Sequence, residues 1–140
     1  MSPSFVIDAS VILAWHDPRE SNVYADGVLD CLKKETAITP TLCCLEVNNV
    51  LRFFEKKELI TSLDLEKAIA FLTSLPILLD GANTDFQIPL VLRLSREYEL
   101  TIYDACYLEL AVRLNLPLAS LDNDLIKASK SAKIAIFNLF

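Results

Sequence analysis

Short uninterrupted apolar runs alternate along the chain with longer segments in which apolar residues recur every three or four positions. Such runs are typical of strands that are buried on both faces, and the longer spacing is typical of amphipathic helices. The pattern predicts strands at residues 4–8, 37–38, 76–79, 117–121 and 134–137. It predicts helices at residues 9–15, 20–34, 41–57, 62–73, 84–99, 101–114 and 123–132, the fifth of them capped by Thr84 or Asp85.

Strands that alternate with helices predict a three-layer α/β/α fold, with a short, mostly parallel central sheet flanked by helices. The 4–8 segment should be the central strand, because it carries no polar residue between Phe5 and Ile7. Ligands of such folds bind at the carboxyl ends of the strands, where Asp8 and Asp122 stand. The chain has 140 residues, 53% of them hydrophobic, and two glycines, which predicts a single domain over residues 1–140.

Four acidic residues stand inside apolar segments of the chain. Burying an ionised carboxylate without a partner costs several kcal/mol, so a fold that keeps several such acids usually brings them to a common cation. The pattern therefore predicts a metal site, and its candidate ligands are Asp8, Glu46, Asp104 and Asp122.

Three of these acids also have a purely structural interpretation. Asp8 and Asp122 each precede a predicted helix and can cap it, which stabilises a helix by about 1 kcal/mol. Thr101 and Asp104 form a weak capping-box pattern in which Asp replaces the usual Glu. Glu46 lies within a predicted helix beside an apolar face that offers no basic partner, so a long-range salt bridge is its structural alternative.

Each acid belongs to a longer motif, and the four motifs follow one another in a fixed order. They are VIDAS at 6–10 with AW at 14–15, LEVNNVLR at 45–52, TIYDACYLELA at 101–111 and LPLASLD at 116–122. In this order and spacing the chain resembles the PIN-domain ribonucleases over nearly its whole length. It most closely resembles the toxin component of VapBC-type toxin–antitoxin pairs.

The resemblance implies roles for residues around the four acids. Asp8, Glu46 and Asp104 match the main metal-site carboxylates of the family, and Asp122 matches the fourth, more variable one. Ser10 matches a small hydroxyl residue that supports the site. Asp124 is an alternative or additional source of the fourth acid, and Ser120 stands where a threonine is common. Trp15 matches a core residue without a catalytic role.

An all-oxygen ligand set favours Mg²⁺ or Mn²⁺ over zinc. The sequence thus predicts a metal-dependent endoribonuclease, in which a metal-activated water attacks the phosphodiester. The resemblance implies a 5′-phosphate and a 3′-hydroxyl at the cut. Because His16 is the only histidine, proton transfer is expected to rest on metal-bound water and an acid such as Asp104.

The resemblance also implies three partners: an RNA substrate, a small antitoxin and a second copy of the chain. The antitoxin is expected to lay an amphipathic segment into a groove between the N-terminal helices. The candidate RNA contacts, which are also explained by solvated helix faces, are Arg52, Lys56, Lys57, Lys127, Lys130 and Lys133.

Charge and cysteine content change this picture little. The net charge of -6 is unfavourable for RNA binding, but an ion held by the acids would reverse the local field. The cysteines form no Cys-x-x-Cys pair, which predicts buried reduced thiols at Cys31, Cys43, Cys44 and Cys106. With no signal segment and no membrane-spanning run of ~18 apolar residues, a cytoplasmic protein is expected.

Two other classes of protein compete with the nuclease. A catalytically silent PIN-like protein-interaction module would be favoured by the loss of one of the acids, and none is missing. A receiver-like phosphoacceptor domain would need paired acids after the first strand, which Asp8, Ala9 and Ser10 do not supply.

Overall fold

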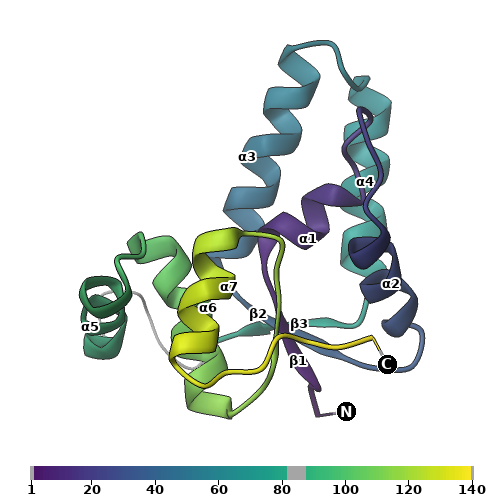
Figure 1. Ribbon diagram of the computed structural model, residues 1–140. Helices are drawn as coiled ribbons and strands as arrows, with labels where there is room; N and C mark the ends of the chain where they lie inside the picture. Colours follow the sequence, from purple (N-terminus) through teal and green to yellow (C-terminus); the bar gives the residue numbers. More distant parts are fainter. Residues whose placement is uncertain (1, 82–87, 140) are drawn as a thin grey trace.

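The computed structural model describes residues 2–81 and 88–139 (Figure 1). A four-stranded sheet with the strand order β3-β2-β1-β4 lies at its centre, and every strand pairing is parallel. The strands are β1 (Phe5–Ile7), β2 (Ala37–Pro40), β3 (Ile77–Asp80) and β4 (Leu118–Ala119). All of β1 is buried, and it lies inside the sheet between β2 and β4, as predicted for the central strand.

Helices pack around this sheet in two groups (Figure 1). Helix α6 packs against β1 and β2, and it is flanked by α5 and α7. Helices α1 to α4 pack against one another in the second group, in which α3 and α4 extend beyond the sheet as a pair. This confirms the predicted α/β class. The helices are α1 (Ala9–Ala14), α2 (Val23–Cys31), α3 (Leu42–Lys56), α4 (Ser62–Ser74), α5 (Pro89–Tyr98), α6 (Ile102–Leu114) and α7 (Asn123–Ser131).

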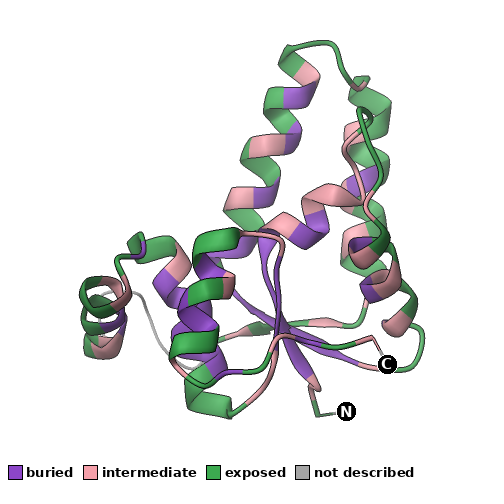
Figure 2. Ribbon diagram, in the orientation of Figure 1, coloured by how far each residue is buried: buried purple, intermediate pink, exposed green. Residues whose placement is uncertain are grey.

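The hydrophobic core lies between the sheet and the helix faces turned toward it (Figure 2). Helix α6 contributes an unbroken buried run at residues 105–111, since it is covered on several sides. The rings of Phe5 and Phe137 stack with centroids 3.9 Å apart and close the core beside β1. Asp8 and Asp122, the acids that follow β1 and β4, are therefore attached to buried strands of the core.

The ends of several elements differ from the predicted ranges. The segment 134–137 is not a strand: it pairs with β4 only through a single parallel bridge between Leu118 and Ile136, because β4 itself is very short. Helix α2 starts at Val23 rather than at residue 20, since the Asn22 side chain accepts a hydrogen bond from Ala25 N (2.9 Å) and caps the helix. The predicted caps Thr84 and Asp85 lie outside the described residues.

The prediction of four buried cysteines is wrong. Cys43 and Cys106 are buried, but Cys31 is half-buried and Cys44 is exposed, and none of the four forms a disulfide. Two large apolar residues of α3 are exposed as well, namely Leu45 (76%) and Phe53 (49%). Helix α3 buries mainly the side that meets α1 and α4. The number of apolar residues in this helix is therefore larger than the number that is buried.

Gly27 has a packing role in α2. A Cβ atom at this position would come within 2.5 Å of Leu139 Cδ1, so the glycine lets the C-terminal segment approach the helix.

In the described part of the chain, no helix has the length and apolar character needed to cross a membrane.

Candidate functional site

The four acids singled out in the sequence line one cavity of about 180 Å³. Asp8 directly follows β1 and Asp122 lies just beyond β4, so both stand at the carboxyl end of the sheet. Glu46 reaches the cavity from α3 and Asp104 from the first turn of α6. The remaining lining residues are Ala9, Ser10, Leu13, Val50 and Tyr107. We call this cavity the acidic pocket.

Asp8 is both a helix cap and a pocket residue. Its carboxylate is 4% exposed, and Oδ1 accepts hydrogen bonds from Ser10 Oγ (2.6 Å) and Val11 N (3.2 Å). Oδ2 accepts a hydrogen bond from Ser120 Oγ. The structural and the functional interpretation of Asp8 are therefore compatible.

Two serines join Asp8 to the segment after β4. Ser10 Oγ accepts a hydrogen bond from Leu121 N (2.9 Å), and Ser120 Oγ accepts one from Asp122 N (3.0 Å). Each hydroxyl thus donates to Asp8 and accepts from the backbone of the β4–α7 connection. Ser120, which the sequence marks only as a substitute for threonine, is 2% exposed and bridges two of the four acids.

Asp122 lines the acidic pocket and Asp124 does not. The Asp122 side chain is half-buried and accepts a hydrogen bond from Leu125 N (2.9 Å), which caps α7. Asp124 is exposed in the first turn of α7, although its charge is close enough to raise the pKa of Asp104. Of the two candidates for the fourth acid, Asp122 is the one with access to the pocket.

The acidic pocket disfavours ionisation of its carboxylates. Burial raises the pKa of Asp8 to about 6, against the opposing effect of its serine hydrogen bonds. Burial also raises the pKa of Asp104 to about 6, and the neighbouring charges of Asp122 and Glu46 add to this shift. Thr101 Oγ1 accepts a hydrogen bond from Asp104 N (3.1 Å) and caps α6, so this capping interaction uses the Asp104 backbone. Burial is the largest cause of both pKa shifts, and the charge of Asp122 adds to each of them.

Glu46 has a neutral partner instead of the salt bridge considered from the sequence. Tyr107 donates a hydrogen bond from its hydroxyl to Glu46 Oε1 (2.6 Å), and its side chain is almost completely buried. Tyr107 is not among the site residues predicted from the sequence. Its spacing of three residues from Asp104 within a predicted helix was the available signal, because residues three apart share a helix face.

The donor chemistry of the pocket fits a hard divalent cation, because all the candidate ligand atoms are carboxylate oxygens. The raised pKa values of Asp8 and Asp104 point the same way, since a cation would relieve the repulsion. However, within residues 2–81 and 88–139 no three acidic, cysteine or histidine side chains stand close enough to hold an ion together.

A second acidic cluster has a structural role. Arg113 on α6 pairs with Asp80 at the end of β3 (2.5 Å) and with Glu109 one helical turn away (2.9 Å). Glu109 is 3% exposed, so the guanidinium neutralises a buried charge. These residues do not line the acidic pocket.

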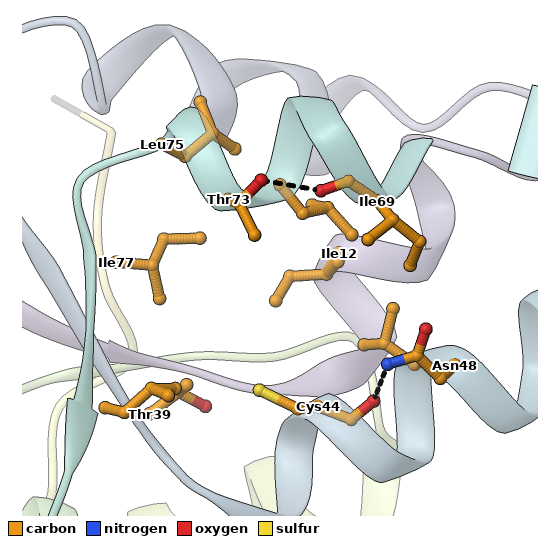
Figure 3. Close-up of a pocket in the computed structure, with 11 residues that line it drawn as sticks. Ile12, Thr39, Cys44, Asn48, Ile69, Thr73, Leu75 and Ile77 are labelled. Carbon is orange, nitrogen blue, oxygen red and sulfur yellow. Dashed lines mark hydrogen bonds between the residues drawn. The ribbon is translucent and has the colours of Figure 1, made fainter. Parts of the chain in front are cut away.

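A larger cavity of about 280 Å³ lies between α1, α3, α4 and the β2–β3 edge (Figure 3). Its lining is mainly apolar, with Ile12, Ile69, Leu75 and Ile77 among the contributors, and it contains no acid. The Asn48 amide donates to Cys44 O (2.7 Å) within it. This lining is suited to binding apolar groups rather than to catalysis.

The basic residues considered for RNA binding are all exposed. Arg52 pairs with Glu55 (2.9 Å), and the Lys57 ammonium lies over the Phe53 ring. Lys127, Lys130 and Lys133 lie on or just after α7, the helix that Asp122 caps. Their role in RNA binding stays a prediction.

Comparison with solved structures finds chains of the same fold. A toxin–antitoxin complex from Klebsiella pneumoniae superposes with a TM-score of 0.67 at 14% identity, covering 98% of each chain. The sarcin-ricin loop cleaving toxin VapC20 from Mycobacterium tuberculosis gives a TM-score of 0.62 at 12% identity, with 96% of this chain and 99% of that chain covered. The protein PAE2754 from Pyrobaculum aerophilum gives 0.60 at 23% identity, with 91% and 86% covered.

A search of curated protein sequences finds no match. The PIN domain profile matches residues 5–131, a range that contains all four pocket acids and the two serines that support Asp8. The chain therefore belongs to the PIN domain family.

Proposed function

We propose that this protein is a Mg²⁺- or Mn²⁺-dependent endoribonuclease and the toxin of a toxin–antitoxin pair. The observation that carries the proposal is the acidic pocket, a cavity at the carboxyl end of the parallel sheet that is lined by four carboxylates from separate segments of the chain. Membership of the PIN domain family and the likeness to a toxin that cleaves the sarcin-ricin loop support the same conclusion.

In this proposal Asp8, Glu46, Asp104 and Asp122 hold the ion. When bound, the ion supplies a water of lowered pKa and neutralises charge on the phosphate. Asp8 is oriented by Ser10 and Ser120, and Asp122 by its capping bond, so these two acids are preorganised. Among the described lining residues there is no histidine, so carboxylates are the available proton acceptors.

The proposed partners are an RNA substrate, a small antitoxin and a second copy of the chain. A toxin–antitoxin complex among the structural neighbours supports the antitoxin. The apolar cavity between α1, α3 and α4 has the lining that an amphipathic antitoxin segment requires.

One observation favours the alternative, a catalytically silent PIN-like interaction module. The acids do not already form a cluster close enough to hold an ion in the described part of the structure. A silent module and a nuclease differ in metal binding, so the two functions can be separated by experiment.

The decisive experiment compares wild-type protein with Asp8→Asn on structured and unstructured RNAs, with Mg²⁺ or Mn²⁺ and with a chelator. Cleavage that requires the metal and disappears in Asp8→Asn is the expected result. Equal cleavage by the two proteins would show a contaminating nuclease and overturn the proposal. Wild-type protein that neither binds Mn²⁺ nor cuts RNA would support the silent module.

A further inference from the structure

Glu46 is held in the acidic pocket by a residue on another helix. Its carboxylate is half-buried on α3, and the Tyr107 hydroxyl on α6 donates to Oε1 at 2.6 Å. A glutamate has a long, flexible side chain, whose ordering costs conformational entropy unless a contact restrains it. The Tyr107 hydrogen bond engages Oε1 and not Oε2 of Glu46. It restrains the Glu46 carboxylate at a position beside the other pocket acids.

Tyr107 is itself held rigidly. The residue is 1% exposed, and its hydroxyl also contacts the Cys43 thiol. Cys43 also contacts Thr39, whose hydroxyl donates to Ile7 O (2.7 Å) at the end of β1. A chain of polar contacts thus runs from the central strand through Cys43 and Tyr107 to Glu46.

The Tyr107 hydroxyl has a single proton, and its hydrogen bond directs that proton at Glu46 Oε1. A hydroxyl that donates to a carboxylate stabilises the ionised form of the carboxylate, which is the form that binds a cation.

We propose that Tyr107 is a positioning residue that orients the Glu46 carboxylate toward the ion in the acidic pocket. The inference rests on the proposed function, because it assumes that the pocket holds a divalent cation. Partners that hydrogen-bond to a metal ligand usually contribute roughly 10- to 100-fold to metal affinity. The opposing explanation is that Glu46 merely satisfies a buried tyrosine hydroxyl, which would otherwise be costly.

The test measures Mn²⁺ affinity without RNA, by the electron paramagnetic resonance signal of free Mn²⁺, in four proteins: wild type, Tyr107→Phe, Glu46→Gln and the double variant. Tyr107→Phe removes one oxygen and keeps the ring. We expect it to weaken Mn²⁺ binding by roughly 10- to 100-fold. In the Glu46→Gln background the same change should add less than about twofold, because residues that act through one another are not additive.

Tyr24→Phe is the matched control. The Tyr24 hydroxyl donates to Phe137 O at 2.7 Å, so this variant also loses one tyrosine hydrogen bond of similar length, but Tyr24 does not line the acidic pocket. We expect a comparable fall in melting temperature and an unchanged Mn²⁺ affinity. A matching loss of affinity in Tyr24→Phe would assign both effects to general loosening and overturn the positioning role.

A second measurement needs no substitution at Tyr107. In protein labelled with ¹³C at its four tyrosines, saturating Mg²⁺ should shift the ring signal of Tyr107 and leave that of Tyr98, on α5 and outside the acidic pocket, in place. An unshifted Tyr107 signal, or unchanged affinity in Tyr107→Phe beside a wild type that binds Mn²⁺, overturns the positioning role alone. A wild type that binds no Mn²⁺ and cuts no RNA overturns the proposed function and this inference together.

Discussion

The Ser120 hydroxyl donates a hydrogen bond to Asp8 Oδ2 across a sequence separation of 112 residues. Both side chains are almost completely buried, and the bond joins the end of β1 to the connection that follows β4. The orientation of the first pocket acid thus depends on a residue near the other end of the chain.

Replacing Ser120 by alanine should destabilise the metal-free protein by about 1 to 3 kcal/mol, the usual effect of losing a hydrogen bond to a charged group. The measurement is the free energy of unfolding in denaturant. Ser131→Ala, at an exposed position on α7, is the control and should change stability by less than about 0.5 kcal/mol. Equal stabilities for the two variants would show that the Ser120 bond is not formed in solution.

Asp8→Asn should stabilise the metal-free fold while abolishing cleavage. Burial raises the pKa of Asp8 to about 6, so its ionisation at neutral pH opposes folding, by up to about 3 kcal/mol for a shift of this size. An asparagine can still accept the capping bond from Val11 N.

The sign of the accompanying pH dependence follows from the raised pKa of Asp8. The pKa of Asp8 in the folded state lies above its ordinary value of 3.8, so wild-type stability should fall as pH rises from about 4 through about 6. Asp8→Asn should show a smaller decline in thermal denaturation curves recorded with a chelator, because only the contribution of Asp104, whose pKa is also raised to about 6, remains. A decline of the same size in both proteins would contradict the assignment to Asp8.

Asp122→Asn and Asp124→Asn should separate the two candidates for the fourth acid. Asparagine caps helices as well as aspartate does, so neither change should unfold α7. Since only Asp122 lines the pocket, we expect Asp122→Asn to slow RNA cleavage at least about tenfold, equivalent to roughly 1.4 kcal/mol. Asp124→Asn should cut at nearly the wild-type rate, and the reverse order would move the fourth ligand to Asp124.

Mg²⁺ or Mn²⁺ should raise the melting temperature of the wild type. A ligand that binds only the folded state at about 100 times its Kd stabilises that state by about 2.7 kcal/mol. Differential scanning calorimetry with and without millimolar metal measures the shift. Asp8→Asn, which lacks one proposed ligand, should show a much smaller shift, and identical shifts in both proteins would point to binding elsewhere.

Arg113→Ala should destabilise the protein without changing Mn²⁺ affinity. The substitution leaves the buried Glu109 carboxylate without its cation, which costs about 3 to 5 kcal/mol for fully buried pairs and less here because the Arg113 side chain is 27% exposed. Arg52→Ala breaks an exposed pair with Glu55 and should cost less than about 1 kcal/mol. A loss of metal affinity in Arg113→Ala would contradict the separation of the two acidic clusters.

Local patterns in the sequence were sufficient for much of the fold. The apolar run at 5–7 and its position before a capping aspartate predicted β1 and α1, because strand burial and helix capping depend on neighbouring residues. The same local logic failed for Cys31 and Cys44, since helical spacing does not tell how much of a helix face another element covers.

The sequence by itself determined the parallel α/β arrangement and the four acids of the candidate site, since apolar periodicity and motif order are properties of the chain. Only the tertiary structure decided which partners hold those acids: Ser120 for Asp8 and Tyr107 for Glu46, the latter across 61 residues. It also decided that Asp122 rather than Asp124 reaches the pocket. The physical reason is that hydrogen bonds between distant segments depend on how the elements pack, and local spacing carries no record of that packing.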